Sequence, residues 1–401
     1  MLLRRQRKIV KKKILFVINS LGCGGAEKSL ISMLSAFDFE KYEVHLQMFQ
    51  PKGMFLNLLP KEVHILQNLP YLQFCGQSLK KQLRNPRFLA IKYRTSIGLH
   101  INQRTGKLHD AQCYWKCASA AFEQMQEPYD IAIAWGQGNP THFVCEKVDA
   151  KKKIAFINAD YEAVGHNKHF DYPFYKKYNY IVAVSEQLKK ILRTVFADMS
   201  NKIVTIYDIN NAELMWKLAE LENPFEDKKD TIKVVTVGRL VKPKGYDLLT
   251  KACKYLKDRG LDFEWHVIGE GPERKNIEND IRKLGIEKHL YLEGAKENPY
   301  CYMANADIYV QTSKNEGYCL TLGEARILNV PVVSTNFDVV FNQLKNEENG
   351  LIVEMTGEAI AEGILRMVEN KVLRTNIISN LQKEKKGNLE ELFKFYNLIE
   401  S

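Results

Sequence analysis

The sequence lacks a long hydrophobic run, a cysteine framework and any compositional sign of disorder. No stretch of about twenty apolar residues occurs among its 401 residues, so we expect no membrane-spanning helix. Of its eight cysteines only Cys113 and Cys117 lie close together, and no second pair follows at zinc-finger spacing. We therefore expect reduced, mostly buried thiols, no metal site and a soluble globular chain of two or three domains.

Acidic residues are missing between Val63 and His109, in a chain whose formal net charge is +10. This stretch holds eight basic residues, Lys80, Lys81, Arg84, Arg87, Lys92, Arg94, Arg104 and Lys107, interleaved with Phe88, Leu89, Ile91, Tyr93 and Ile97. Such a surface suits anionic lipid headgroups or a diphosphate-bearing acceptor. A solvated basic face is the alternative. No nucleic-acid-binding motif is present, so we expect no nucleic-acid partner.

The N-terminus is also basic, and the apolar run Ile14–Ile18 follows it. This start superficially resembles a signal peptide, with Arg4, Arg5, Arg7, Lys8, Lys11, Lys12 and Lys13 before the run. The run is too short, however, and it leads into glycine-rich sequence instead of a cleavage site. We expect a basic tail before a first buried strand, in a cytoplasmic protein.

Short apolar runs alternate with longer amphipathic stretches along the whole chain. The first half has expected strands at 13–19, 43–49, 130–135, 153–158, 180–184 and 202–207, and helices at 26–37, 111–126 and 185–196. After a polar linker at 220–230, strands are expected at 232–237, 263–268, 290–292, 308–311, 332–334 and 351–353, and helices at 245–259, 272–284, 318–328 and 359–368. The alternation predicts an α/β fold of two Rossmann-like halves whose parallel sheets face a cleft.

This pattern divides the chain into three parts. We expect an N-terminal domain at 1–225, a C-terminal domain at 226–372 and a helical segment at 373–401. One amphipathic helix at 372–396 is expected to pack across the two halves.

A glycine loop, Ser20–Gly25, follows the first strand and opens a helix. Gly22, Gly24 and Gly25 would let the backbone approach a ligand, and the helix N-terminus attracts an anion. The loop is not a complete Gly-x-Gly-x-x-Gly, and no acidic residue follows the second strand to bind a ribose. It is therefore a weak dinucleotide signature, and a plain tight turn is the alternative.

A second strand–loop–helix motif carries two cations, Arg239 and Lys244, between Gly238 and Gly245. Fixed cations at the carboxyl end of a strand suit a departing diphosphate. A solvated basic loop is the alternative for this motif taken alone.

Two carboxylates, Glu316 and Glu324, flank a helix that we expect to begin at Tyr318. Their separation is a little over two helical turns, which would place them on roughly the same side. Carboxylates accept hydrogen bonds from vicinal hydroxyls of a sugar or a ribose. The backbone amides of residues 317–320 could bind phosphate oxygens at the helix N-terminus.

These motifs, taken in order, resemble the retaining GT-B glycosyltransferases of family 4, also called glycosyl transferases group 1. The shared features are Glu316-x7-Glu324, Gly24–Glu27, Gly238–Leu240 with Lys244, Val267–Pro272 and Asn349–Val353. The resemblance is strong over residues 231–354 and looser over the first half. It extends to enzymes that assemble bacterial capsule and O-antigen polysaccharides.

The resemblance implies roles for the matching residues. Arg239 and Lys244 would neutralise the donor diphosphate, Glu324 would bind the nucleotide ribose, and Glu316 would contact the transferred sugar. Further donor contacts would come from Gly238, Gly269, Gly317, Tyr318, Cys319 and Leu320, while Gly22, Gly24 and Gly25 would approach the phosphates and the acceptor. The family needs no bound metal or other cofactor, and UDP is its most frequent nucleotide.

Two segments depart from the family pattern. The family often has a histidine where Asn158 stands, and an amide cannot accept a proton, although it can hydrogen-bond a sugar hydroxyl. His142 or His166 could take that role, but a lone loop histidine is more often structural. The glycine-rich loop expected near Thr335 is also replaced, by Ser334–Asp338.

We therefore predict a retaining hexosyltransferase that moves a sugar from a nucleotide donor to a lipid-linked or polysaccharide acceptor. It would lie on the inner face of a bacterial membrane, in peripheral contact with anionic lipid. The alternatives are a GT-B sugar-nucleotide epimerase, a Rossmann-type NAD-dependent oxidoreductase and a two-lobed sugar-binding protein. The last would normally be secreted.

Overall fold

The computed structural model describes residues 11–22, 24–162, 164–226, 231–316 and 319–401. Most of the basic N-terminal tail, Cys23, Gly317 and Tyr318 lie outside the described residues. The chain forms two compact units: unit 1 is residues 1–209 with 389–401, and unit 2 is residues 210–388. The limits predicted from the sequence fall after residues 225 and 372.

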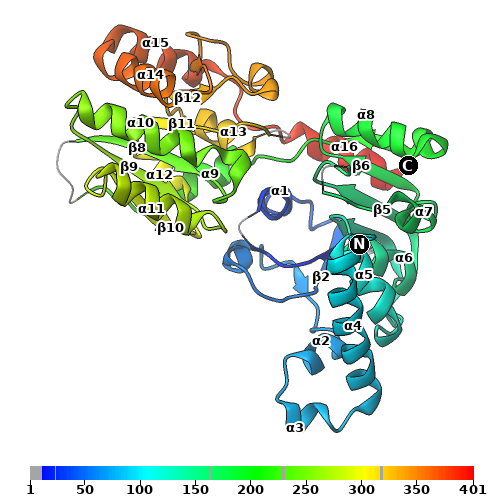
Figure 1. The fold of residues 1–401 in the computed structure, drawn as a ribbon. Coiled ribbons are helices and arrows are strands. Elements are labelled where there is room, and N and C mark those ends of the chain that lie inside the picture. Colours follow the sequence, from blue (N-terminus) through cyan, green and yellow to red (C-terminus); the bar gives the residue numbers. More distant parts are fainter. Residues whose placement is uncertain (1–10, 23, 163, 227–230, 317–318) are drawn as a thin grey trace, which may run out of the picture. The chain divides into compact units, whose positions relative to one another are not determined.

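Unit 1 is built on a seven-stranded parallel sheet with the order β3-β2-β1-β4-β5-β6-β7 (Figure 1). Its strands are β1 Lys12–Ile18, β2 Tyr42–Met48, β3 His64–Ile65, β4 Tyr129–Trp135, β5 Ala150–Ile157, β6 Tyr180–Ala183 and β7 Ile203–Thr205. The central strands are buried on both faces, which explains their continuous apolar runs. Six of the seven strands were predicted, and the two-residue β3 was not.

Helices cover both faces of this sheet. They are α1 Gly25–Leu34, α2 Pro70–Cys75, α3 Leu79–Gln82, α4 Pro86–Thr105, α5 Asp110–Ala118, α6 Asn139–Lys147, α7 Lys168–Tyr175, α8 Glu186–Val195 and α16 Glu390–Glu400, with 3-10 turns at Met54–Leu58, Ser119–Ala121 and Ala197–Lys202. Ser185 caps α8 as expected, its hydroxyl accepting from the amide of Leu188 at 3.1 Å. The helix expected at 111–126 is shorter and ends at Ala118. A 3-10 turn follows, and Phe122 after it is extended and stacks on Trp115.

Unit 2 contains a six-stranded parallel sheet with the order β10-β9-β8-β11-β12-β13. Its strands are β8 Ile232–Val237, β9 Phe263–Ile268, β10 Leu290–Gly294, β11 Ile308–Gln311, β12 Val332–Thr335 and β13 Leu351–Val353, all close to the predicted ranges. Its helices are α9 Ala212–Ala219, α10 Tyr246–Asp258, α11 Arg274–Leu284, α12 Tyr300–Ala304, α13 Leu320–Ile327, α14 Gly357–Glu369 and α15 Lys371–Lys383, with 3-10 turns at Lys242–Lys244 and Asp338–Asn342. Strand and helix side chains form one continuous apolar core.

The C-terminal segment differs from the single helix expected at 372–396. It forms two helices, of which α15 belongs to unit 2 and α16 to unit 1. Gly387 lies between them with φ +71°, and a Cβ there would overlap the carbonyl oxygen of Asn210. A helix cannot continue through such a residue, so the prediction of one helix was wrong.

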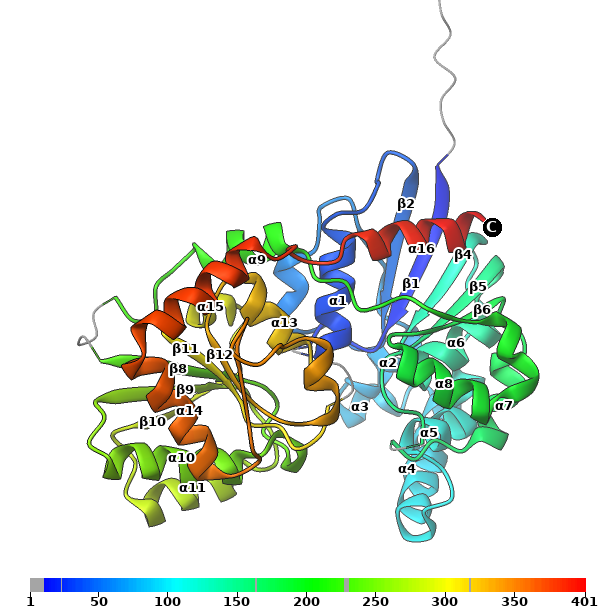
Figure 2. The same cartoon turned by 90° about the horizontal axis from the view of Figure 1, so that it is seen from above.

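Helix α16 completes the core of unit 1. Figure 2 shows it crossing the strands of the sheet, and Phe395 contacts Phe16, Phe37 and Phe156 there. At its end, the carboxylate of Glu400 accepts a hydrogen bond from the hydroxyl of Tyr42 at 2.6 Å. No helix in the described part of the chain is both long and apolar enough to cross a bilayer.

Replacing Phe395 with alanine should destabilise unit 1 by about 3–5 kcal/mol, because its ring is 0% exposed and leaves a cavity. Phe393, two residues earlier on the same helix, is 69% exposed and serves as the matched control. Its alanine variant should change stability by less than about 0.5 kcal/mol. Differential scanning calorimetry of the two variants measures both effects, and equal losses would show that α16 is not docked as described.

Candidate active site

The predicted cations and Glu316 meet at the carboxyl edge of the unit 2 sheet. Strands β8 and β11 are neighbours, and the chain leaves them toward opposite sides of the sheet. This is a topological switch point, the position at which open parallel sheets bind ligands. The loop after β8 carries Arg239 and Lys244, and the loop after β11 carries Ser313 and Glu316.

The carboxylate of Glu316 accepts three hydrogen bonds on a single oxygen. Oε1 receives Lys244 Nζ at 2.6 Å, Ser313 Oγ at 2.5 Å and Gln311 Nε2 at 3.1 Å. Among the described residues, Oε2 has no hydrogen-bond partner. The arrangement fixes the carboxylate and keeps one oxygen available to accept from a ligand hydroxyl.

A buried polar chain behind Glu316 sets the orientation of Gln311. The amide oxygen of Gln311 accepts from Tyr309 at 2.6 Å and from Thr321 at 3.2 Å, so its nitrogen points toward Glu316. Tyr309 and Gln311 lie on β11 and are almost fully buried. Gln311 and Ser313 were not predicted from the sequence, although their place at the end of a strand beside β8 was a usable signal.

The loop that carries Lys244 packs directly on the loop after β11. The hydroxyl of Thr312 donates to the carbonyl of Lys244 at 2.8 Å, and the amide of Lys314 donates to the carbonyl of Pro243 at 2.7 Å. Gly245 has φ +68°, and a Cβ there would overlap the carbonyl oxygen of Thr312. Only glycine permits this approach, which brings the ammonium of Lys244 to Glu316.

Charge favours the protonated form of Lys244. Burial lowers the pKa of its ammonium, but the attraction and the hydrogen bond of Glu316, together with the nearby Cys319, act in the opposite direction, and the net effect raises the pKa. Arg239 is exposed on the same loop and lies close enough to oppose this rise. Two cations therefore stand at the end of β8, with the lysine paired and the arginine facing solvent.

Glycines also bring the loops after β8 and β9 together. A Cβ at Gly269 would overlap the carbonyl oxygen of Gly238, and one at Gly271 would overlap that of Leu240. The amide of Leu240 donates to the carbonyl of Glu270 at 3.0 Å. The two glycine motifs found in the sequence therefore build one layer of backbone at the sheet edge.

Glu324 occupies a different environment from Glu316. Helix α13 begins at Leu320, after Cys319 with φ +65°, so Glu316 precedes the helix. The prediction that Glu316 and Glu324 lie on the same side of one helix was therefore wrong. Glu324 is 0% exposed and accepts from the hydroxyl of Tyr300 at 3.2 Å. Of the predicted phosphate-binding segment, Cys319 and Leu320 are described, and Gly317 and Tyr318 lie outside the described residues.

In unit 1 the glycine loop is tied to the end of β4. The indole nitrogen of Trp135 donates to the carbonyl of Ala26 at 2.8 Å, just after Gly24 and Gly25. The amide of Leu21, before Gly22, donates to the carbonyl of Lys52 at 3.1 Å. The loop therefore lies at the carboxyl edge of the sheet, at the β1–β4 switch point.

Asn158 lies at the end of the neighbouring strand β5. Its backbone N–H donates to Oε1 of Gln137 at 3.2 Å, and the backbone N–H of Ala159 donates to the same oxygen at 3.2 Å. Its own Oδ1 is buried with no hydrogen-bond partner in the described part of the chain. An unpaired buried acceptor is costly, so this oxygen suits a hydroxyl of a bound ligand.

The two histidines that could replace the missing family histidine both contact one aspartate. His142 Nε2 and His166 Nδ1 contact the two oxygens of Asp171 at 2.8 and 3.1 Å, and Tyr161 donates to it at 2.8 Å. Burial raises the pKa of Asp171, but the hydrogen bonds from both histidines outweigh burial and hold it well below its ordinary value. The cluster is buried and structural, and it joins α6 to α7.

A second buried carboxyl of unit 1, Asp208, lies beside helix α1. The next residue, Ile209, donates its amide to the hydroxyl of Ser29 on that helix at 3.0 Å. Burial raises the pKa of Asp208 to about 7, and the nearby charge of Glu27 acts in the same direction. No sequence motif pointed to this residue.

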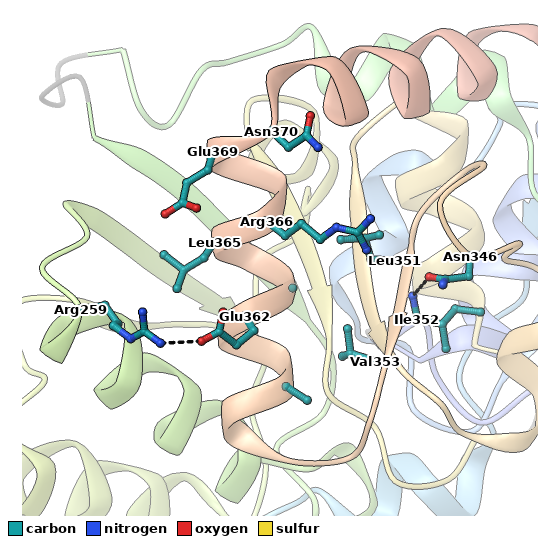
Figure 3. Close-up of a pocket in the computed structure, with 12 residues that line it drawn as sticks. Arg259, Asn346, Leu351, Ile352, Val353, Glu362, Leu365, Arg366, Glu369 and Asn370 are labelled. Atoms are coloured by element: carbon teal, nitrogen blue, oxygen red, sulfur yellow. Dashed lines mark hydrogen bonds and ion pairs between the residues drawn. The ribbon is translucent and has the colours of Figure 1, made fainter.

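A hollow lies on another part of unit 2, away from these residues. Its volume is about 530 Å³, and Figure 3 shows it between α14 and β13. Three of its four charged lining residues are in ion pairs, Arg259 with Glu362 at 2.9 Å and Arg366 with Glu347 at 2.8 Å. It contains none of the predicted site residues, and its paired charges do not point to a ligand.

Comparison with known proteins shows which family unit 2 resembles. The family model of Glycosyl transferases group 1 matches residues 219–384, a segment that lies within unit 2 and includes Arg239, Lys244, Glu316 and Glu324. Over this segment, unit 2 is similar to the glycosyl transferases of group 1.

Three curated relatives illustrate the match. The chain is 27% identical over 90% of its length to the Campylobacter jejuni N-acetylgalactosamine-N,N'-diacetylbacillosaminyl-diphospho-undecaprenol 4-alpha-N-acetylgalactosaminyltransferase, and covers 92% of it. It is 29% identical over 54% of its length to the capsular polysaccharide biosynthesis glycosyltransferase CapM of Staphylococcus aureus. An uncharacterised glycosyltransferase of Methanocaldococcus jannaschii is 24% identical over 56% of the chain. The chain covers 61% of CapM and 64% of the Methanocaldococcus protein, which is less than two thirds of the length of each.

Solved structures support the fold. HepE from Anabaena, in complex with UDP-glucose, has a TM-score of 0.68 and 16% identity, and the alignment covers 97% of this chain and 99% of HepE. The two parallel-sheet, Rossmann-like units have the GT-B fold, as predicted. The roles assigned to individual residues stay predictions.

Gly245→Ala should open the contact between the loops after β8 and β11. A left-handed alanine costs about 1–2 kcal/mol, and the overlap with Thr312 should add about 1–3 kcal/mol. Gly260→Ala is the control, because Gly260 also has a positive φ, +76°, but a Cβ added there would meet no atom within 4 Å. Chemical denaturation monitored on unit 2 should show the larger loss for Gly245→Ala, and equal losses would contradict the close approach.

The raised pKa of Asp208 predicts a pH dependence of stability. The unfolded carboxyl ionises near 3.8 and the folded one near 7, so the folded state binds more protons between these values and stability falls as pH rises through this window. Asp208→Asn removes the titration and should be more stable than wild type above pH 7, by at most ~4 kcal/mol. Melting temperatures between pH 4.5 and 8 measure the difference, and parallel curves for both proteins would contradict the assignment.

Proposed function

We propose that the chain transfers a hexosyl group from a UDP-sugar to a lipid-linked or glycan acceptor, with retention of the anomeric configuration. The observation that carries the proposal is the pair of Lys244 and Glu316 at the switch point of unit 2, beside the exposed Arg239. It combines cations for a diphosphate with a fixed carboxylate for sugar hydroxyls. HepE, which shares the fold, was solved with UDP-glucose, and this supports UDP as the nucleotide.

The donor would lie along the carboxyl edge of the unit 2 sheet. Arg239 and Lys244 would neutralise the diphosphate, and the close-packed backbone at Gly238 and Gly269 would let it approach the strands. Glu316 would accept a sugar hydroxyl on Oε2, since Oε1 is already engaged. Glu324 would bind the ribose. Its carboxylate would either give up the hydrogen bond from Tyr300 or accept from Tyr300 and the ribose together.

The chemical step would be a front-face substitution. The bond between the anomeric carbon and the β-phosphate oxygen breaks, the acceptor oxygen bonds to that carbon on the same face, and the acceptor proton passes to the departing phosphate oxygen. No protein base is required, which is compatible with an amide at Asn158. Protein cations would stabilise the negative charge that develops, so we expect no bound metal to be needed.

The acceptor proposal follows the relatives. The Campylobacter protein is named for a diphospho-undecaprenol substrate, and the Staphylococcus protein for capsular polysaccharide. We infer that this chain also builds a cell-surface glycan, at the cytoplasmic face of a bacterial membrane and in peripheral contact with it. The unpaired Oδ1 of Asn158 would accept a hydroxyl of the acceptor or of the transferred sugar.

Nucleotide binding tests the donor site first. In the absence of added metal, UDP at a hundred times its dissociation constant should stabilise the protein by roughly 2.7 kcal/mol. Arg239→Ala should reduce this gain strongly, whereas Lys242→Ala, an exposed lysine of the same loop, should keep it. Thermal unfolding with UDP, GDP, ADP and NAD measures the effect.

Glu316→Gln tests the chemistry separately. It keeps the size of the side chain but removes its charge, so UDP binding should persist while transfer from a UDP-sugar falls by about 10²–10³-fold. Full transfer activity in folded Glu316→Gln and Arg239→Ala variants would overturn the proposed site. Stabilisation by NAD alone would favour an oxidoreductase, and conversion of the donor without an acceptor would favour an epimerase.

A further inference from the structure

The acid-free stretch of the sequence folds into a helical projection of unit 1, α2 to α4. Figure 1 shows α3 and α4 extending away from the sheet. Five of the twelve exposed large apolar side chains described in the whole chain lie here: Leu79, Leu83, Tyr93, Ile97 and Ile101. Monomeric proteins seldom gather such side chains without a partner.

The tip of the projection combines apolar and basic side chains. Leu79 is 74% exposed and Leu83 is 69% exposed, and Lys80, Lys81 and Arg84 beside them are exposed as well. These three cations form none of the ion pairs found among the described residues. Two protruding leucines surrounded by unpaired cations suit an interface between hydrocarbon and negatively charged headgroups.

The apolar surface continues along α4. Tyr93, Ile97 and Ile101 are four residues apart, so they form a stripe on one side of the helix. On another side of α4, the guanidinium groups of Arg87 and Arg94 donate to the carbonyls of Ala120 and Lys116, both at 3.1 Å. These contacts hold α4 on α5 and on the 3-10 turn that follows it, and the apolar stripe remains exposed.

The projection is ordered before it meets a partner. Gln82, between the two exposed leucines, is buried and donates to the carbonyl of Gln77 at 2.7 Å, while Lys92 donates to its amide oxygen at 2.9 Å. Asn85 caps α4 by accepting from the amide of Phe88 at 3.1 Å. Binding through the tip therefore does not require a segment to fold.

We infer that this projection inserts into the surface of an anionic lipid bilayer, with Leu79 and Leu83 in the acyl boundary and Lys80, Lys81 and Arg84 on the headgroups. The stripe of α4 extends the buried apolar area. This inference deepens the peripheral location given under the proposed function by assigning the surface responsible. It is tested by lipid binding, so it can fail while sugar transfer stands.

Other partners fit the same surface less well. Two copies of the chain pairing through it would bring like charges together, because residues 63–109 contain no carboxylate. A single-stranded nucleic acid would need aromatic side chains for stacking, and four of the five exposed apolar residues are aliphatic. A bilayer accepts both the aliphatic side chains and the cations.

Flotation with vesicles of phosphatidylcholine and phosphatidylglycerol at about 70:30, in about 0.1 M salt, tests the inference on the full chain. The wild type should float with these vesicles and remain in solution with pure phosphatidylcholine. Leu79→Ser/Leu83→Ser and Lys80→Glu/Lys81→Glu/Arg84→Glu should each weaken binding at least about tenfold, the second more strongly at low salt. All five side chains are exposed, so melting temperatures should stay close to the wild-type value.

Matched controls separate this surface from general charge and hydrophobicity. Leu221→Ser/Val372→Ser removes two aliphatic side chains of similar exposure, and Lys275→Glu/Lys283→Glu/Lys288→Glu makes the same charge change on unit 2. Both controls should bind vesicles like the wild type. Unchanged binding of the Leu79/Leu83 variant, equal losses in the controls, or binding to RNA in place of vesicles would overturn the inference.

Discussion

The ion pair of Lys244 and Glu316 is the contact around which unit 2 arranges its functional edge. It joins the loops after two adjacent strands, and both partners are largely screened from water, with side-chain exposures of 21% and 11%. Removing two charges from water is expensive, and their attraction alone does not reliably repay that cost. Here Ser313 and Gln311 add hydrogen bonds to the carboxylate, so the pair is held in one geometry.

This geometry depends on features that have no charge. Glycine at 245 permits the close approach of Thr312, and the glycines at 269 and 271 pack the loop after β9 against the loop after β8. Three loops are thereby fixed by backbone contacts, and the charged side chains extend from a rigid frame. A preorganised site of this kind needs little rearrangement when charge develops on a leaving group.

The sequence predicted most of the sheets, because buried parallel strands are continuous apolar runs, and it predicted Arg239 and Lys244 at the carboxyl end of a strand. It did not predict α4, although Asn85, Pro86 and Gly106 mark its ends and Tyr93, Ile97 and Ile101 recur at helical spacing. It also missed Gln311 and Ser313, since their contact with Glu316 depends on which strands are neighbours. The C-terminal segment is split by the extended Glu384 and by Gly387, whose close contact with Asn210 is not revealed by the residue pattern.

Under the proposed function, the residues of unit 1 limit how the acceptor could lose its proton. Asn158 cannot accept one, and His142 and His166 are held by Asp171 in a buried cluster. Without these groups as bases, a mechanism in which the departing phosphate receives the proton requires no basic side chain from the protein. The contribution of unit 1 would then be to orient the acceptor hydroxyl, a task for which an amide oxygen such as that of Asn158 is sufficient.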